Sequence, residues 1–286
     1  MNIHHYTSLS SLALILKNRT IRFTRTDLLD DVQEFHLGKE WSGAMSFFVS
    51  SWSAESEENI PQWKMYGDSF KGVRLTLDGN IFSWNKISLE ISRKKENGKK
   101  YGLIIRHADA PFRKEDMFGK GYILLPAYLS ENEFKNKVKY VDDVQEAIDK
   151  LIVKTDNDIQ TKGNSTGSVF IKSSQWVYQN EFRFALMATT GPNLIYENSP
   201  KNYEDDFLNE MKKLDEETNY LNKFKTPMLE YVDLPVSPTT FDNLHVKLGP
   251  LAPASLRIIV ESLCEKYAPN AVIKESSLSG QIRGKM

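Results

Sequence analysis

The sequence predicts an α+β fold in which strands dominate and helices fall between them irregularly. Many short segments alternate apolar and polar residues with a period of two, which is typical of strands. A few longer segments repeat apolar residues at helical spacing, and they do not alternate regularly with the strands. Regular alternation would favour a doubly wound parallel sheet, so its absence favours an α+β domain.

Composition and charge bound the kind of protein. The 286 residues are 40% hydrophobic and 11% aromatic, which is enough to bury a sizeable core as one large domain or as a domain with a substantial insertion. Lys and Arg number 37 against 38 Asp and Glu, giving a net charge of −1. There is therefore no global field that would hold nucleic acid by counterion release, and a nucleic-acid partner would need a local basic patch.

Three features predict a soluble, cytoplasmic protein with no membrane partner. The single cysteine, Cys264, lies among apolar residues of a helical segment, so we interpret it as buried filling, and no disulfide framework exists. The N-terminus lacks the basic-then-apolar pattern of a signal peptide. No apolar run approaches the roughly 20 residues that span a bilayer.

The N-terminal residues predict a strand and a capped helix. Residues 3–7 form the predicted strand, and Ser8 is placed to cap a helix with a leucine-rich apolar stripe. His5 and Thr7 share one face of the strand, near the positive end of the helix, where a polar ligand would be held. The alternative is that the paired histidines, His4 and His5, are a surface feature without a role.

An acidic turn and a short aromatic helix follow. Residues 27–34 carry several carboxylates, which we interpret as solvated helix caps, since no His or Cys completes a metal-ligand set and no metal is expected. Asn59 and Pro61 predict the start of a helix. Trp63 and Tyr66 would share one face of it, where core packing is the default role. We expect Trp63 to be core and Tyr66 to border a cleft.

The other elements are predicted from the same periodicities. Strands are predicted over 20–24, 45–52, 72–77, 87–92, 103–105, 138–141, 230–234, 245–250 and 271–274. Helices are predicted over 144–154, 203–224 and 254–267, and a polar, mobile loop over 156–168.

The stretch 174–186 is the one around which the other elements are arranged. Its alternation predicts a central strand with apolar side chains on one face and polar side chains on the other. The apolar face consists of Trp176, Tyr178, Phe182, Phe184 and Leu186. The polar face consists of Gln179, Glu181 and Arg183. Polar side chains on a central strand need partners or a ligand. The alternative is a solvated pair of Glu181 and Arg183 on an exposed sheet face.

Three pieces of the chain form an ordered set. They are His5-Tyr6-Thr7 with its leucine-rich helix, the block Phe48-Val49-Ser50-Ser51-Trp52-Ser53 followed by Trp63-x-x-Tyr66 and Gly72-Val73, and Trp176-x-Tyr178-x-x-Glu181-x-Arg183. In this order they resemble a bacterial and phage family known only as a domain of unknown function, number 2971. Leu248-Gly249-Pro250, with the helix and strand after it, extends the resemblance to nearly the whole chain. The resemblance implies a single domain over residues 1–286 with a family-variable insertion at about 87–170.

The same layout resembles the ADP-ribosyltransferase fold, which has a split antiparallel β-sheet core with peripheral helices. In that fold a His on the first strand, an aromatic residue from the middle and a Glu on a late strand surround NAD, which is a substrate, and no metal is involved. By this resemblance His5 would hold the adenosine-side ribose with Thr7 beside it, and Tyr66 would stack on nicotinamide. Glu181 would bond the nicotinamide ribose and stabilise the oxocarbenium ion as nicotinamide leaves.

Two neighbours of Glu181 also have implied roles. Gln179 falls where transferases of this fold often carry a Gln or Glu that faces the acceptor. Many members of the unknown family have Glu there, so Gln179 is a departure that leaves the acceptor type open. Arg183 would hold Glu181 in its ionised form or contact the pyrophosphate. We therefore expect His5, Tyr66 and Glu181 to converge on one cleft.

The resemblance implies an NAD-dependent ADP-ribosyltransferase of the bacterial cytoplasm. A toxin or phage-defence effector is expected, with nucleic acid (RNA or DNA) or protein as the macromolecular acceptor and an antitoxin protein as a further partner. One alternative is a catalytically silent binding module of the same fold, in which the His, Tyr and Glu serve packing. The other is an NAD glycohydrolase that gives the glycosyl cation to water.

Overall fold

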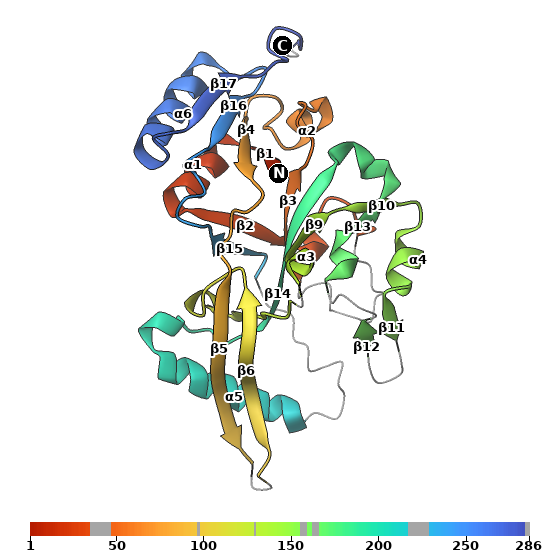
Figure 1. The fold of residues 1–286 in the computed structure, drawn as a ribbon, viewed down its shortest axis with the longest axis vertical. Helices are drawn as coiled ribbons and strands as arrows, with labels where there is room; N and C mark the ends of the chain where they lie inside the picture. The colour runs from red at the N-terminus through yellow and green to blue at the C-terminus, as the bar shows by residue number, and fades with distance from the viewer. Residues whose placement is uncertain are drawn as a thin grey trace.

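The computed structural model describes residues 1–34, 47–95, 98–128, 130–154, 159–161, 166–216 and 229–283. It is a mixed α+β structure, as predicted, with a large open sheet and helices at the periphery (Figure 1). Parts of the predicted loop, residues 155–158 and 162–165, lie outside the described residues, and so does the predicted end of the helix over 203–224.

The strands of the main sheet come from both ends and the middle of the chain. They are β1 (Asn2–Thr7), β2 (Thr20–Arg25), β3 (Phe47–Ser53), β4 (Val73–Asp78), β7 (Phe118–Gly119), β8 (Tyr122–Leu124), β9 (Lys135–Lys137), β14 (Glu181–Thr190), β15 (Tyr231–Pro235), β16 (His245–Leu248) and β17 (Val272–Glu275). In the described part of the chain this sheet has eleven strands, and eight of them follow the order β17-β16-β4-β1-β3-β14-β8-β7. The pairs in this sheet are antiparallel, except that β16 and β17 are parallel.

Three two-stranded ribbons and a set of helices complete the fold. The ribbons are β5 (Asn85–Lys94) with β6 (Lys100–Ala110), β10 (Lys139–Val141) with β13 (Ile171–Ser173), and β11 (Ile152–Lys154) with β12 (Ile159–Thr161). The helices are α1 (Leu9–Asn18), α2 (Ile60–Met65), α3 (Glu131–Phe134), α4 (Val144–Asp149), α5 (Pro200–Glu216) and α6 (Ala254–Tyr267). The 3-10 turns are η1 (Thr26–Leu28), η3 (Glu115–Met117), η4 (Gly167–Phe170), η5 (Ser174–Gln179) and η6 (Tyr196–Asn198).

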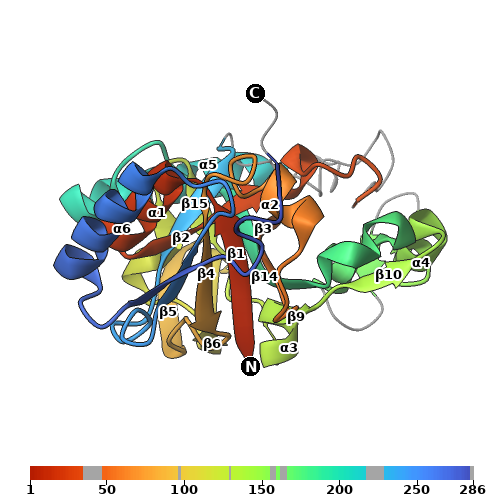
Figure 2. The ribbon, with the colours of Figure 1, turned by 90° about the horizontal axis from the view of Figure 1, so that it is seen from above.

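The helices α1 and α6 lie side by side next to the sheet (Figures 1 and 2). Ser8 caps α1, as predicted, because its side chain accepts a hydrogen bond from the amide of Ser11. The buried side chains Leu12 and Leu16 of α1 join the main core together with Cys264 of α6. The predicted bounds of α6 and the filling role of Cys264 are both confirmed.

The predicted central strand begins later than the alternation indicates. Residues 174–179 form the 3-10 turn η5, which starts after Ser173 and ends at Asn180, whose φ is 40°. Trp176 and Tyr178 therefore do not lie on the apolar face of a strand, and the prediction was wrong for them. The strand β14 starts at Glu181, and its predicted apolar side chains from Phe182 to Leu186 are buried in the main core.

The ribbon β5–β6 projects from the rest of the molecule (Figure 1). One of its faces carries Ile87, Leu89 and Ile91, which are buried in the same core cluster as Phe207 and Leu208 of α5. This ribbon lies within the region that we predict to be a family-variable insertion, and its variability stays a prediction. Farther along that region, the predicted helix over 144–154 is wrong in its second half, because α4 ends at Asp149 and β11 begins at Ile152.

Helix length and polarity are relevant to membranes. Within the described ranges, no helix is long and apolar enough to cross a bilayer.

Candidate functional site

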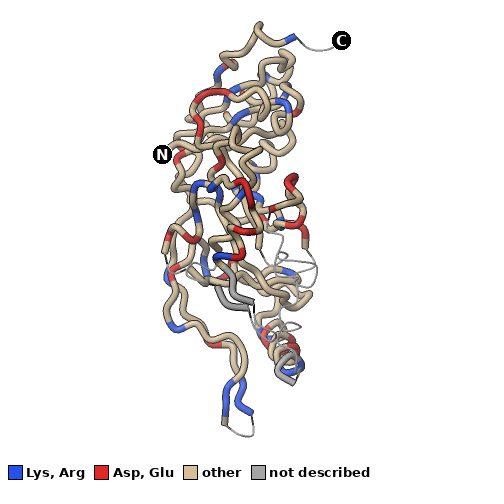
Figure 3. The backbone as a smooth tube through the Cα atoms, turned by 90° about the vertical axis from the view of Figure 1, so that its right-hand side faces the viewer, with Lys and Arg blue, Asp and Glu red and all other residues tan. Residues whose placement is uncertain are grey.

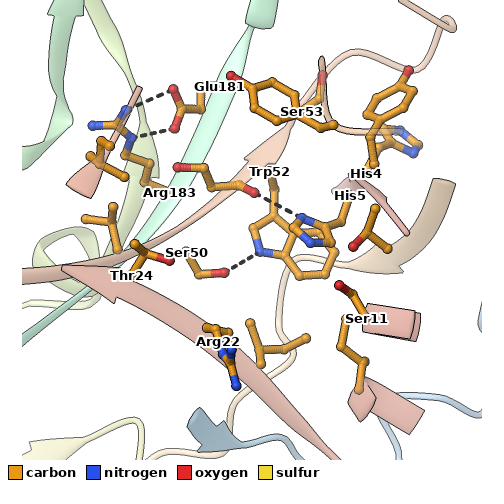
Figure 4. A pocket seen from close by; sticks show the side chains of 18 of the residues that line it. His4, His5, Ser11, Arg22, Thr24, Ser50, Trp52, Ser53, Glu181 and Arg183 are labelled. Carbon is orange, nitrogen blue, oxygen red and sulfur yellow. Dashed lines mark hydrogen bonds and ion pairs between the residues drawn. The ribbon is translucent and has the colours of Figure 1, made fainter. Parts of the chain in front are cut away.

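A pocket with a volume of about 460 Å³ lies where the main sheet parts. The strand β3 pairs with β14 along one side, from Phe47 to Ser53. On its other side β3 pairs with β1 only at Ser53, and with β2 only at Phe48 and Val49. In the described ladders, residues 50–52 thus have no strand partner on that side, and this unpaired edge forms one wall of the pocket (Figure 4).

The structure brings all six predicted site residues to this pocket. They are His5, Thr7, Tyr66, Gln179, Glu181 and Arg183. The strand register explains why His5 and Glu181 lie near each other. Ser53 of β3 lies opposite His4 on one side and opposite Glu181 on the other. The expected convergence of His5, Tyr66 and Glu181 on one cleft is therefore observed.

His5 is held as a neutral ring by the edge of β3. Its Nδ1 lies 3.2 Å from the carbonyl oxygen of Ser51. A carbonyl only accepts, so Nδ1 carries the proton and Nε2 remains an acceptor. Burial lowers the pKa of His5 more than this hydrogen bond raises it, and the ring lies 4.9 Å from that of Trp52 (Figure 4). His4 is 4% exposed and bonds to Thr76, so the two histidines are not a surface feature.

Tyr66 reaches the pocket from the end of α2. Asn59 caps this helix, as predicted, by accepting a hydrogen bond from the amide of Gln62. Trp63 is fully buried, which confirms its predicted core position, whereas Tyr66 is 37% exposed. The Tyr66 hydroxyl donates to the carboxylate of Asp30. Burial and the nearby Asp30 raise the pKa of Tyr66 far above its ordinary value, so its phenol stays protonated.

A left-handed turn sets the path of the chain directly after Tyr66. Residues 68–70 have φ values of 49°, 51° and 76°, a conformation that three consecutive non-glycine residues rarely adopt. The amide of Leu251 donates to the carbonyl of Phe70 at 3.0 Å, which holds the turn in place. A Cβ on Gly249 would lie 2.3 Å from the same carbonyl oxygen, so the close approach requires glycine. This contact gives a physical reason for the glycine at position 249.

Gln179 connects α2 to the pocket. Its side-chain Nε2 donates to the hydroxyl of Tyr66 at 2.9 Å. Its backbone carbonyl accepts a hydrogen bond of 2.8 Å from Nε2 of Gln62. Asn59 donates in the same way to the carbonyl of Tyr178 at 2.7 Å. Two side chains of the α2 region thus clamp the turn η5, which leads directly into β14.

Glu181 belongs to a buried cluster of two carboxylates and two cations. The guanidinium of Arg183 contacts both carboxylate oxygens of Glu181, at 2.5 and 3.0 Å (Figure 4). The Nζ of Lys172 lies 3.3 Å from Glu181 and 2.7 Å from Glu34. Glu34 in turn lies 2.6 Å from Arg183. The four side chains are between 1% and 5% exposed.

The cluster moves the pKa values of its two carboxylates in opposite directions. Burial tends to raise the pKa of Glu181, but the charges of Arg183 and Lys172 outweigh burial and hold that pKa below its ordinary value. Burial raises the pKa of Glu34 in spite of the same two cations. Glu181 lines the pocket, and Glu34 does not. Of the two buried carboxylates, Glu181 is therefore the one that lines the pocket and is held in its ionised form.

Two expectations about charged residues need correction. Arg183 does not extend toward the pyrophosphate of a ligand, because its guanidinium is 1% exposed and is engaged by Glu181, Glu34 and the carbonyl of Val169. It fills the other expected role, which is to hold Glu181, and the alternative of a solvated pair is wrong. The acidic turn 27–34 is not a set of solvated caps, because Glu34 lies in the buried cluster and Asp30 accepts from Tyr66.

Sequence reasoning missed three residues of the site, namely Asp30, Glu34 and Lys172. Lys172 carries a usable signal, because it directly follows the apolar run 169–171, where a charge implies a buried ion pair. No local pattern identifies Glu34 as its partner, since the two lie far apart in the chain. In the part of the chain that the structure describes, no group of three or more His, Cys, Asp or Glu side chains is placed to hold a metal ion.

Comparison with known proteins gives one match, to a family model that covers less than half of the chain. No curated protein matches the chain, and no solved structure matches it. A family model matches residues 62–184. The matched range contains α2 from Gln62 onward, Tyr66, η5 and the first residues of β14, which include Glu181 and Arg183. The family is described as Protein of unknown function (DUF2971), and the match supports the family assignment drawn from the sequence.

Proposed function

We propose that this chain is an NAD-dependent ADP-ribosyltransferase whose NAD site is the pocket beside β3. The observation that carries the proposal is that His5, Tyr66 and Glu181 line one pocket at a place where the sheet parts. An ADP-ribosyltransferase-like split sheet is part of the proposal. The pocket volume of about 460 Å³ is within the roughly 300–1,000 Å³ typical of small-molecule and cofactor sites.

In this proposal Glu181 stabilises the cation that forms when nicotinamide leaves. The bond between C1 of the ribose and the nicotinamide nitrogen breaks, and nicotinamide departs as a neutral molecule with the electron pair. The acceptor nucleophile then bonds to C1 and loses a proton. A fixed, ionised carboxylate opposes the positive charge at C1 without reorganising. The two contacts from Arg183 and the lowered pKa of Glu181 support this role.

The other pocket residues have proposed roles in binding. His5 offers Nε2 as an acceptor for a hydroxyl of the adenosine-side ribose, and Thr7 lines the pocket on the same strand. Tyr66 is exposed enough for its ring to stack on nicotinamide. Gln179 is proposed to face the acceptor, which is a nucleic acid or a protein. A bacterial toxin or phage-defence effector with an antitoxin partner is the setting that we propose.

One observation favours a second candidate, a catalytically silent binding module. Both oxygens of Glu181 are engaged by cations, which is also the arrangement of a purely structural ion pair. A thermal melt with NAD separates a pocket that binds NAD from one in which His5, Tyr66 and Glu181 serve packing only. An enzyme or NAD-binding protein should melt at a higher temperature when NAD is in large excess over its Kd, because NAD binds only the folded state.

The test of catalysis compares two isosteric variants of one cluster, Glu181→Gln and Glu34→Gln. Each removes one carboxylate charge from the same two cations, so each should lose stability, by about 3–5 kcal/mol if the remaining charges stay buried. Only Glu181 lines the pocket. We expect Glu181→Gln to lower NAD cleavage on the order of a hundredfold or more, whereas Glu34→Gln should cleave NAD in proportion to its folded fraction.

Urea unfolding supplies the folded fraction at the assay temperature, so that both rates are compared per folded molecule. If the two variants lose cleavage equally per folded molecule, or if Glu181→Gln keeps near-normal cleavage, the cluster is structural and the binding module replaces the enzyme. Labelled NAD incubated with a cell extract then separates transfer from hydrolysis. Label that protease or nuclease releases from a macromolecule identifies a transferase, and label that stays as free ADP-ribose identifies a glycohydrolase.

A further inference from the structure

The tip of the ribbon β5–β6 concentrates positive charge. Residues 93–100 contain five Lys or Arg side chains and one Glu, in a chain whose net charge is −1. The basic residues are Arg93, Lys94, Lys95, Lys99 and Lys100. Figure 3 shows both arms of the ribbon basic where they approach the lower end of the molecule. This is the kind of local basic patch that a nucleic-acid partner would need.

The strand register places two of these charges against each other. Lys94 lies directly opposite Lys100 across the ribbon, and both side chains are exposed. Like charges in directly opposite positions destabilise a strand pair. Nearby acids offset part of the charge, since Lys100 pairs with Glu90 and Arg93 pairs with Asp205 of α5. The direct opposition of Lys94 and Lys100 is thus unfavourable for the ribbon itself, and a bound anion would relieve it.

One face of the β5–β6 ribbon packs against the main core. Ile87, Leu89 and Ile91 are 1–7% exposed and belong to the main core, which also contains Phe207 and Leu208 of α5. The opposite face carries the exposed residues Lys86, Ser88, Glu90 and Lys94. At about 3.3 Å per residue, strands of 10 and 11 residues reach roughly 30 Å, so the basic tip is held at the end of a long, braced arm.

We propose that the basic residues on the two arms near the tip of the β5–β6 ribbon, at 93–95 and 99–100, are a contact site for the phosphate backbone of duplex DNA. A two-stranded β-ribbon fits the major groove of B-form DNA, which is about 12 Å wide. The major groove of A-form RNA is too deep and narrow for such an element to read. Lysines at the tip contact phosphates without reading bases, so the binding is independent of sequence. The inference goes beyond the NAD chemistry and does not depend on it.

The test measures binding of the whole chain to a fluorescent 25-base-pair duplex by anisotropy between 50 and 200 mM salt. Four phosphate contacts would weaken binding roughly a hundredfold over this range, because each contact contributes about 0.9 to the slope of log K against log salt. The test variant replaces Lys94, Lys99 and Lys100 with Gln, all three exposed. It should bind at least tenfold more weakly at 100 mM salt, and its slope should fall by about 2.7.

The matched control replaces Lys17, Lys266 and Lys274 with Gln. These lysines are exposed on α1, α6 and β17, at the other end of the molecule in Figure 1, and the net charge changes by the same amount. The control should keep wild-type affinity and slope. Equal losses in both variants would show a diffuse charge effect and overturn the proposal. Equal or tighter binding of duplex RNA, or of single-stranded DNA, would overturn the groove assignment.

The binding assay contains no NAD, so its outcome is separate from that of the proposed enzyme. Circular dichroism melts of both triple variants establish that they fold. A wild-type chain with no measurable affinity for the duplex at 50 mM salt would also overturn the proposal, whatever the result of the NAD experiments.

Discussion

Replacing Glu58 with Gln should destabilise the chain at neutral pH and have little effect in acid. The Glu58 carboxylate, 2% exposed, joins the C-terminal segment to α2. It accepts hydrogen bonds from Lys247 at 2.7 Å and from the amide and hydroxyl of Ser277 at 2.8 and 2.9 Å. It also accepts from the hydroxyl of Ser276 and, at 3.0 Å, from Nε1 of Trp63. Removing its charge therefore weakens a joint between two distant parts of the chain.

The magnitude follows from the pKa of Glu58. Burial tends to raise this pKa, but the hydrogen bonds from Lys247, Ser276 and Ser277 lower it from 4.5 to about 2. One pKa unit corresponds to about 1.4 kcal/mol, so the ionised carboxylate contributes about 3 kcal/mol to the free energy of unfolding. Because the pKa is lowered in the folded state, this contribution is fully present above pH 4.5 and is lost as the pH falls toward 2.

Urea unfolding of the wild type and of Glu58→Gln at pH 7, 5, 4 and 3 measures the effect. The difference in unfolding free energy should be about 2–3 kcal/mol at pH 7 and pH 5, and it should shrink steadily below pH 4.5. Glu57→Gln is the control, because its side chain is exposed and it is the direct neighbour in sequence. A difference under about 1 kcal/mol at pH 7, or one that does not change with pH, would refute the assignment of this stability to the Glu58 charge.

Two further predictions concern the pocket. Trp63→Ala should lower the free energy of unfolding by about 3–5 kcal/mol, because the side chain is fully buried, whereas Tyr66→Ala should lower NAD cleavage more than stability. Thermal melts and cleavage rates of the two variants, measured in parallel, check both statements, and equal destabilisation would reduce Tyr66 to packing. Gln179→Ala should change which acceptor is labelled more than the rate of NAD cleavage, and side-by-side assays of cleavage and label transfer test this.

Much of the fold was predictable because one face of most strands is buried. Alternation identified β4, whose apolar residues Val73, Leu75 and Leu77 enter the main core on one side. The strand β3 was identified by its run of apolar residues, which are buried on both faces, with Phe48 and Trp52 in the main core and Phe47 and Val49 in a second cluster. Alternation failed at 174–179, where alternating aromatics lie on a 3-10 turn. Local hydrogen bonding explains the failure, since Ser173 accepts from the amide of Gln175 and Asn180 takes a left-handed conformation. Ser and Asn at the two ends of the segment were the available turn signals.

The meeting of the site residues was predictable only through the family pattern. His5, Tyr66 and Glu181 are distant in sequence, and strand register brings two of them together, which no local periodicity encodes. Apart from the charge of Lys172 after an apolar run, local patterns gave no sign of the buried ion pairs or of the partners in them. The sequence of an acidic turn does not show whether water or distant cations neutralise its carboxylates. Glu34 is buried because Lys172 and Arg183, which are distant in sequence, lie beside it.

The opposite behaviour of the two buried carboxylates is informative about the site. Glu34 and Glu181 share the cations Lys172 and Arg183, yet burial raises the pKa of Glu34 and the cations lower that of Glu181. A pair of neighbouring carboxylates with pKa values pushed apart usually marks a division of roles. These directions mean that Glu34 takes up a proton before Glu181 as the pH falls, so that Glu34 then no longer competes with Glu181 for the two cations. Glu181 is therefore the carboxylate of the pair that is held ionised, which is the charge state that the proposed chemistry needs.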